Sequence, residues 1–494
     1  MKIAFRADSS YLIGTGHIHR CVEIAKAFKR KKISSIFISS NFDGNINGII
    51  KQNFNLFKIS YPKKKLIIKT KLEILNDAKK TIFYVKKHKI NYLFVDNYQL
   101  DLIWEKLVSK YCKIVLISDY LNRKTICDYI INYHLLYEDH KLNKFYLNKN
   151  CKRLVGPQYS IIKKVNRTYS HLNIKKKLIV VYMGGVDNKN YTSKIISVLT
   201  KRLFINYKIL IIIGNKNLNK EAIIKQIFKH KNFSHKLGNK KNLYNFISRC
   251  SLSICNAGSF MYENLTVGNN LIVLPQSQLQ QKICSQLSLA KLIIYFKKNS
   301  QINSNFILRK LKNSIKKDKS IELSSLYDGK GTNRIVEFFI NLNSNMNCKL
   351  ILAKKEDKFF LFNLLNNYEV VKNSITRKIT DFQDHEKWFF KNLKSNLSKI
   401  YLLKFKTLKI GQVRLDKISK NKINITYAIS NEFRENSYGI KMIKIILNKV
   451  SKGLNLIACV RKFNLPSRKI FNKIGFKPII SLNNKSIIKY SFKK

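Results

Sequence analysis

The start of the chain combines the groups that a phosphate site and a proton transfer both need. His17 and Arg20 follow the turn Gly14-Thr15-Gly16, which separates an apolar run at residues 2–5 from an apolar helical face. Glycines let a backbone approach a phosphate closely, and a helix N-terminus favours an anion. An imidazole beside it can act as a general base. The segment therefore predicts a phosphate-bearing substrate next to a base, the simpler alternative being a surface turn with an ordinary histidine.

Polar side chains follow two later apolar runs. Asp96-Asn97-Tyr98 ends one run, and Asp119 ends the next. In an α/β domain the carboxyl ends of parallel strands face the ligand. Asp96 and its neighbours are therefore predicted to contact a polar ligand, although Asp96 could instead cap the helix that follows.

Two further junctions, in the middle of the chain, suit a nucleoside diphosphate. Gly184-Gly185 and Asp187 follow a strand-like run, and Gly258-Ser259 opens a helix that carries Glu263 one turn later. Backbone amides at a helix start can hold a diphosphate. Because a carboxylate accepts two donors, Glu263 can bind both hydroxyls of a ribose.

Short apolar strands alternate with longer amphipathic helices over the first 345 of the 494 residues. This alternation predicts an α/β fold with two doubly wound parallel sheets, in lobes at residues 1–168 and 169–345. A mixed α+β domain is expected at 349–494. Two such lobes around a cleft are the layout of nucleotide-sugar enzymes, by analogy of fold. Candidate strands lie at 3–6, 34–38, 92–96, 113–118, 129–132, 178–183, 207–213, 252–255 and 271–274, and in the last domain at 400–405, 411–417 and 422–429.

The formal net charge of +67 accompanies many Asn, Ile, Phe and Tyr residues. These residues and lysine share A/T-rich codons, and the lysines are spread along the whole chain. Codon bias therefore explains the charge better than a dedicated nucleic-acid partner, which is not expected. The surface should still attract anionic ligands.

The nine cysteines form no CxxC pair and show no spacing suited to zinc. We expect reduced, mostly buried thiols, with Cys255 and Cys459 packed inside apolar strands, and no metal. There is no leader-like start and no apolar run long enough to span a membrane. The expectation is a soluble cytoplasmic protein without a membrane partner.

The opening motif Arg6-Ala7-Asp8-Ser9-Ser10 through Gly14-x-Gly16-His17-x-x-Arg20-Cys21 resembles the start of the UDP-2,4-diacetamido-2,4,6-trideoxy-β-L-altropyranose hydrolases. These enzymes of pseudaminic acid synthesis are related in fold to the GT-B glycosyltransferases, which have two Rossmann-like lobes. The resemblance covers about residues 1–340. It continues, in the same order, at residues 154–159, 183–187, 258–263 and 328–334.

This resemblance implies hydrolysis of a UDP-sugar at its anomeric carbon, with release of UDP. His17 matches the catalytic histidine that activates water, and Tyr98 is expected beside the sugar as a second catalytic residue; no metal is implied. A GT-B glycosyltransferase that passes a UDP-amino sugar to an acceptor is the alternative. The expected substrate-binding residues are Gly14, Thr15, Gly16, Arg20, Asp96, Gly184, Gly185, Asp187, Gly258, Ser259, Glu263 and Gln280.

The chain departs from the hydrolase pattern at two places. Asn97 stands where the family usually has histidine, and Leu279-Gln280 stands where it usually has Asn-Gln. Both departures bear on sugar specificity more than on the reaction class.

Residues 349–494 resemble the GCN5-related N-acetyltransferases (GNAT), through segments at 373–374, 385–389, 410–414, 427–430, 434–439, 464–467 and 473–476. The resemblance implies that acetyl-CoA is bound, its diphosphate held by amides at a helix start. Ser437 replaces a glycine of the family, and its N–H can still serve if its φ is negative. Glu432 and Tyr438 are the candidates for the catalytic base. The alternative is a domain that has this fold but no acetyltransferase activity. The expected cofactor-binding residues are Arg434, Ser437, Tyr438, Gly439, Asn464 and Ser467.

Together the two resemblances suggest consecutive steps in one chain. The acetyltransferase would acetylate a UDP-4-amino sugar, and the hydrolase would then release the diacetamido sugar.

Overall fold

The computed structural model describes residues 1–62, 64–68, 70–119, 121–136, 138–162, 177–215, 217–238, 240–296, 304–305, 307, 326–342, 347–479 and 486–494. The chain forms two compact units: Met1–Cys127 with Tyr159–Val336, and Asp128–Gln158 with Glu337–Lys494. The boundary expected at 168/169 and the lobe end expected at 345 lie outside the described residues. The division into three domains stays a prediction.

The first lobe is a parallel sheet in the order β3-β2-β1-β4-β5. Its strands are β1 (Ile3–Ala7), β2 (Ser35–Ser40), β3 (Asn55–Ile59), β4 (Tyr92–Asp96) and β5 (Lys113–Ile117), and its helices are α1 (Gly16–Arg30), α2 (Asn47–Lys51), α3 (Lys71–Lys87) and α4 (Leu102–Val108). Every residue of β1 is buried because β1 lies inside the sheet. The strand order reverses between β1 and β4, and in doubly wound sheets ligands bind at this switch point.

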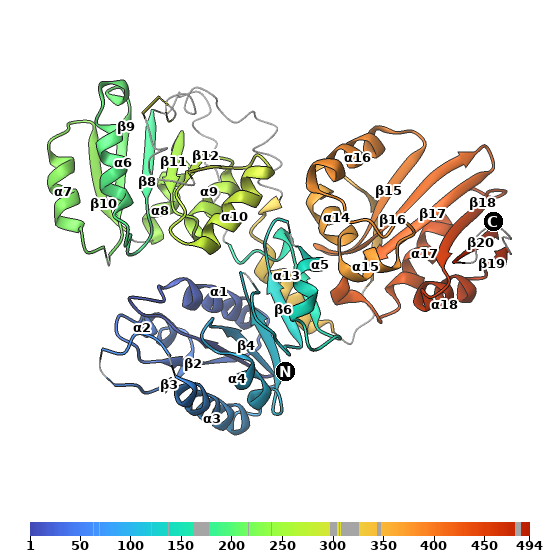
Figure 1. The fold of residues 1–494 in the computed structure, drawn as a ribbon, viewed down its shortest axis with the longest axis horizontal. Coiled ribbons are helices and arrows are strands. Elements are labelled where there is room, and N and C mark those ends of the chain that lie inside the picture. The colour runs from blue at the N-terminus through green and yellow to red at the C-terminus, as the bar shows by residue number, and fades with distance from the viewer. Residues whose placement is uncertain are drawn as a thin grey trace. The chain divides into compact units, whose positions relative to one another are not determined.

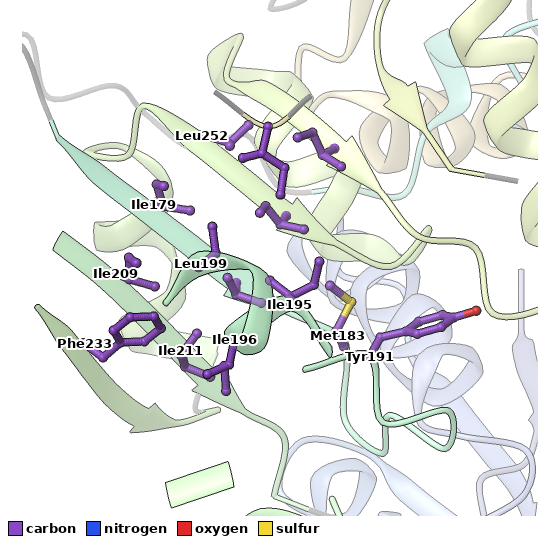
Figure 2. Packing of buried hydrophobic residues seen from close by; sticks show 14 of the residues in the cluster. Ile179, Met183, Tyr191, Ile195, Ile196, Leu199, Ile209, Ile211, Phe233 and Leu252 are labelled. Atoms are coloured by element: carbon purple, nitrogen blue, oxygen red, sulfur yellow. The ribbon is translucent and has the colours of Figure 1, made fainter. Parts of the chain in front are cut away.

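The second lobe repeats this plan in the order β10-β9-β8-β11-β12-β13. Its strands are β8 (Leu178–Tyr182), β9 (Lys208–Ile213), β10 (Phe233–Leu237), β11 (Leu252–Cys255), β12 (Asn270–Val273) and β13 (Ile294–Tyr295). Its helices are α6 (Tyr191–Leu199), η4 (Arg202–Phe204), α7 (Lys220–Phe228), α8 (Lys240–Ile247), α9 (Ser259–Val267) and α10 (Gln278–Leu289). A later helix, α13 (Gly331–Ile340), is divided between the two units after Val336. In Figure 2, Ile179 of β8 and Ile211 of β9 pack with Ile195 of α6 in one buried cluster. Strands covered on both faces need continuous apolar runs, as in Lys208–Ile213.

The second unit contains a mixed sheet in the order β14-β15-β16-β17-β18-β20-β19, drawn in orange and red in Figure 1. Its strands are β14 (Lys349–Leu352), β15 (Ser398–Phe405), β16 (Leu408–Ser419), β17 (Lys422–Ile429), β18 (Asn455–Arg461), β19 (Lys477–Ile479) and β20 (Ile487–Lys493). Its helices are η6 (Lys355–Asp357), α14 (Lys358–Leu365), α15 (Tyr368–Asn373), α16 (Phe382–Lys394), η7 (Asn431–Phe433), α17 (Tyr438–Lys449) and α18 (Leu465–Ile474). β17 and β18 pair only from Lys422 to Asn424, so these two parallel strands separate towards their carboxyl ends.

A short segment from the middle of the sequence belongs to this same unit. It comprises β6 (Tyr129–Asn132), α5 (Asp139–Leu142), η1 (Asn143–Phe145), β7 (Lys152–Val155) and η2 (Pro157–Tyr159), the last of which ends one residue beyond the unit boundary. β6 and β7 pair in parallel.

The expectation of parallel α/β lobes followed by a mixed α+β domain is confirmed. The strands expected in the lobes are present, with ends shifted by at most two residues. β3, β7, β10 and β13 were not expected. β10 reads Phe-Ser-His-Lys-Leu and is exposed at four of its five positions, so it lacks the apolar run that marks a central strand.

Cys459 corrects one expectation about the cysteines. It lies in β18 but is exposed, whereas the other eight cysteines are buried. Its neighbours Ala458 and Val460 point to the buried face, and successive strand residues alternate between faces. Among the described residues, no helix is long and apolar enough to cross a membrane.

The buried imidazole of His385 predicts acid sensitivity of the second unit. The ring packs against Phe362 and Trp388, and its Nε2–H donates to the Lys358 carbonyl at 3.0 Å. Burial lowers the pKa of His385 from 6.5 to about 4. Below pH 6.5 the unfolded chain therefore binds more protons than the folded one, and stability falls as the pH drops towards 4.

The expected loss between pH 6.5 and 4 is about 3 kcal/mol, since each pKa unit corresponds to about 1.4 kcal/mol. Urea unfolding followed by tryptophan fluorescence at several pH values measures it. His385→Gln should flatten the pH dependence over this window, and His235→Gln, which alters an exposed histidine, should leave it unchanged. An equally steep slope in His385→Gln would contradict this assignment.

Candidate active site

The His17 side chain is paired with a carboxylate from the neighbouring strand. β1 ends at Ala7, α1 begins at Gly16, and β4 ends at Asp96, so His17 and Asp96 meet at the switch point of the sheet. His17 Nδ1 lies 2.6 Å from Asp96 Oδ1. A carboxylate only accepts hydrogen bonds, so the proton of the neutral ring belongs on Nδ1, and Nε2 is left as the basic nitrogen.

Arg20, one turn further along α1, holds this carboxylate in place. Its Nε and Nη2 each donate to an Asp96 oxygen at 2.9 Å, and its Nη1 donates to Asp119 at 2.5 and 2.6 Å. Burial raises the pKa of Asp96, but Arg20 and His17 outweigh it and leave that pKa below its usual value. Asp96 therefore stays ionised behind the imidazole. The alternative that Asp96 caps the next helix is wrong, because Asp101 caps α4.

Tyr98 lies at the open side of this group. Its ring meets the His17 ring edge-on with centroids 5.0 Å apart, and its hydroxyl donates to Asp119 Oδ2 at 2.7 Å. Desolvation of its hydroxyl raises the pKa of Tyr98 well above its usual value, and the negative charge of Asp119 raises it further. Tyr98 therefore remains protonated at neutral pH, although the residue as a whole is 46% exposed.

Asn97 points away from the His17 group. It is buried, its Nδ2 donates to Asp8 Oδ2 at 2.7 Å, and its Oδ1 accepts from the Gln99 amide. The residue that departs from the hydrolase pattern thus fixes the turn between Asp96 and Tyr98. Arg6 in turn donates to both oxygens of Asp8. An arginine within an apolar strand needs a buried partner, so Arg6 was the feature of the sequence that could have indicated this contact.

In the second lobe, Asn256 lies against two of the predicted glycines. A Cβ on Gly184 would come within 2.8 Å of Asn256 Nδ2, and one on Gly258 within 3.2 Å of its Oδ1. Gly184 also has φ +92°, which a residue with a side chain adopts at a cost. The close approach of Asn256 explains the glycine at each position, a role that the sequence did not indicate.

The other residues predicted to bind substrate in this lobe make different contacts. Both Asp187 oxygens are used inside the lobe, by the amides of Tyr191 and Thr192 and by the Thr192 hydroxyl at 2.7–3.0 Å. The Gln280 side chain accepts from the Gln276 amide. α9 begins at Ser259 with Gly258 as its N-cap, and Glu263 is buried one turn later. Contact of these residues with a substrate stays a prediction.

In the second unit, several predicted cofactor residues lie where β17 and β18 separate. Asn464 caps α18 by accepting from the Ser467 amide at 3.3 Å, and the Ser467 hydroxyl lies 3.0 Å from that of Tyr427 in β17. Arg434 donates to the Ile429 carbonyl at 3.0 Å.

Of the remaining predicted residues, Glu432, Tyr438 and Gly439 are buried around the start of α17, and Ser437 is exposed. A Cβ on Gly439 would lie 2.8 Å from Ile470 Cδ1, so a glycine lets α17 approach α18. Glu432 and Tyr438 are both buried. Among the described residues, no cluster of three or more His, Cys, Asp or Glu side chains could hold a metal ion.

Ser437 does not meet the expectation of a negative φ. It stands before α17 with φ +58° and ψ 10°, the left-handed conformation that glycine adopts readily. The backbone thus keeps the shape suited to the family's glycine although the side chain has changed. Left-handed backbone costs a residue with a side chain about 1–2 kcal/mol.

Ser437→Gly is therefore expected to stabilise the second unit by about 1 kcal/mol. Thermal unfolding should show a higher midpoint. Ser430→Gly is the matched control, since Ser430 precedes η7 with φ −57° and should lose stability from the added chain freedom. A Ser437→Gly midpoint below that of the wild type would contradict the strain at this residue.

Comparison with known proteins found one matching family model and several similar proteins. Residues 349–477 match the family model described as an acetyltransferase (GNAT) domain. A UDP-2,4-diacetamido-2,4,6-trideoxy-β-L-altropyranose hydrolase of Campylobacter jejuni is 24% identical over 272 residues, which is 55% of this chain and 90% of the relative. A Methanocaldococcus jannaschii protein named "Uncharacterized protein MJ1062" is 24% identical over 97% of both chains. The crystal structure of Acinetobacter baumannii MurG covers 69% of this chain and all of MurG at 12% identity, with a TM-score of 0.47.

The relative from Methanocaldococcus jannaschii spans almost the whole chain, so the joining of the two parts is not peculiar to this sequence. The chain thus combines a part similar to a nucleotide-sugar hydrolase with a C-terminal GNAT acetyltransferase domain.

Proposed function

We propose that the chain is a bifunctional sugar-modifying enzyme that hydrolyses UDP-2,4-diacetamido-2,4,6-trideoxy-β-L-altropyranose and N-acetylates its UDP-amino-sugar precursor, in the cytoplasmic synthesis of pseudaminic acid. The observation that carries the hydrolase part is the pairing of His17 Nδ1 with Asp96 at the switch point of the first lobe. This arrangement leaves Nε2 free of its own proton, as a general base requires.

In the proposed hydrolysis, His17 Nε2 takes a proton from water as the water oxygen attacks the anomeric carbon. The bond between that carbon and the diphosphate oxygen breaks, and UDP leaves with the bonding electrons. Asp96 stabilises the imidazolium that forms, and Arg20 holds Asp96 in the required orientation. Tyr98 is half exposed beside the ring, and because its proton is donated to Asp119, its hydroxyl oxygen is placed to accept a hydrogen bond from the sugar.

The second lobe supplies the proposed nucleotide site. The start of α9 at Ser259 offers backbone amides for the diphosphate, and Glu263 offers a carboxylate for the ribose hydroxyls. Asn256, held between Gly184 and Gly258, adds an amide that can donate to the same diphosphate.

In the proposed acetyl transfer, a sugar amine attacks the acetyl carbonyl and the CoA thiol leaves. Because a bound thioester and a positioned amine react once a proton is removed, positioning supplies most of the rate. The loop at residues 434–439 and the gap between β17 and β18 are the proposed acetyl-CoA site. The product of this step would be the substrate of the hydrolase.

The test of the hydrolase assignment is release of UDP and free sugar from the UDP-diacetamido sugar by the full-length chain. Rapid release of both in water supports hydrolysis. Release of UDP only after addition of an acceptor alcohol would instead establish the GT-B glycosyltransferase alternative, in which His17 would deprotonate that acceptor.

A further inference from the structure

A buried carboxylate joins the segment at residues 128–158 to the acetyltransferase fold. Asp139, at the start of α5, is 1% exposed. Its Oδ2 accepts from the Asn367 side chain at 2.9 Å and from the Tyr368 amide at 2.8 Å, and its Oδ1 accepts from Arg153 at 2.6 Å. All four residues belong to one compact unit, although Asp139 and Asn367 are 228 positions apart.

This contact continues to the loop that precedes α17. Asn367 Oδ1 accepts from Arg434 Nη2 at 2.7 Å, and Arg434 Nε donates to the Ile429 carbonyl at the end of β17. Asn367 therefore uses one end of its amide for Asp139 and the other for Arg434. The orientation that Asp139 imposes on Asn367 is the orientation that presents an oxygen to Arg434.

β7 ties the same loop from a second direction. The Arg153 amide donates to Asn431 Oδ1 at 2.9 Å, and Lys152 Nζ lies 3.3 Å from the Arg434 carbonyl and 3.0 Å from Glu435 Oε2. The Arg153 side chain is paired with Asp139, so this carboxylate contacts both Asn367 and the strand β7 that bind the loop.

The loop needs such support because its backbone is strained. Glu435 has φ +69° and Ser437 has φ +58°, and neither is glycine. Left-handed residues in such a loop turn successive N–H groups towards one concavity, which suits an anion. Each costs about 1–2 kcal/mol, so the conformation persists only if contacts around it hold it in place.

We propose that Asp139 is a positioning residue for acetyl-CoA: it holds residues 431–437 in the conformation that receives the cofactor diphosphate. The acetyltransferase site is thus completed by residues 128–158, which lie outside the GNAT match in the sequence. This inference rests on the proposed binding of acetyl-CoA by this loop.

Asp139→Asn in the full-length chain is the central test. The amide keeps the size of the side chain but has one oxygen instead of two, so it cannot accept from Arg153 and also from Asn367 and Tyr368 on separate oxygens. We expect the Kd for coenzyme A, measured by calorimetry, to rise about tenfold or more. The kcat of acetyl transfer at saturating acetyl-CoA should stay near the wild-type value. The matched control is Glu138→Gln, the preceding carboxylate, which is exposed and pairs with Lys141.

Asn367→Ala provides a second variant that leaves the pair of Asp139 and Arg153 in place. It should raise the same Kd, and the double variant should lose less than the sum of the two single losses, because both break one connection. Unchanged affinity for coenzyme A in both single variants, even with a lowered melting temperature, would show a merely structural contact and overturn the inference. If the wild type itself binds no coenzyme A, the proposed acetyl-CoA site fails and the inference fails with it.

Discussion

His17→Gln is expected to lower the rate of UDP release by about 10²- to 10⁴-fold, the usual contribution of a general base. Glutamine keeps a polar side chain of similar reach but cannot take up a proton. Since the proton moves only in the transition state, kcat and kcat/KM should fall by the same factor while substrate affinity is kept. Steady-state measurement of UDP release from the UDP-diacetamido sugar gives both constants.

His19→Gln is the matched control, because His19 lies two positions further along α1 and on a different side of it from His17. Its rate should stay near the wild-type rate. Asp96→Asn should cost a comparable factor to His17→Gln, since an amide facing Nδ1 favours the wrong tautomer of the imidazole. A wild-type rate in His17→Gln would remove His17 from the mechanism and leave water activation to another group.

Arg6→Met is expected to destabilise the first lobe by about 3–5 kcal/mol, because it leaves buried carboxylates without their partner. Arg6 is fully buried, with Nη1 2.5 Å from Asp8 Oδ1 and Nη2 2.5 Å from Asp77 Oδ2. Asp77 also accepts from Trp104 Nε1 at 2.9 Å, so the cluster joins β1, α3 and α4. Thermal or urea unfolding of the full-length chain measures the loss, and a lower soluble yield should accompany it.

The triple variant Arg6→Met, Asp8→Asn, Asp77→Asn should recover part of this stability, since it removes the buried charges together with their partner. Arg202→Met, at an exposed position in η4, is the control and should change stability by less than about 0.5 kcal/mol. If Arg6→Met lowers stability no more than Arg202→Met does, the buried ion pairs contribute little to stability. The position of Asp8, which accepts from Asn97, must then depend on packing alone.

The strand and helix pattern of the lobes could be predicted because it is local. Apolar runs of four to six residues with turn residues between them mark β1, β4, β8 and β11, and these strands are central. β3 and β10 were not predicted because each is an edge strand, and an edge strand needs fewer apolar residues.

The individual residues of the site could be named, but not all their partners. His17, Arg20, Asp96, Tyr98 and Asp119 were each recognisable as polar residues at strand ends. Their pairing depends on β1 lying next to β4, which brings residues 79 positions apart within 2.6 Å. A carboxylate that binds a ligand and one that accepts from the first amides of a helix also look alike in a sequence. The structure shows that Asp187 accepts from the amides of Tyr191 and Thr192 at the start of α6.

The sequence alone thus determined the two kinds of fold, the opening motif with His17 and the glycine turns at residues 184–185 and 258, since these follow from local patterns of apolar and turn residues. The tertiary structure decided which carboxylate orients His17 and that Ser437 keeps a glycine-like backbone. It also decided that Asp139 supports the acetyltransferase loop. Each of these depends on which segments, distant in sequence, come into contact in the fold. Hydrogen bonds act over about 3 Å in space, whatever the separation of the residues along the chain.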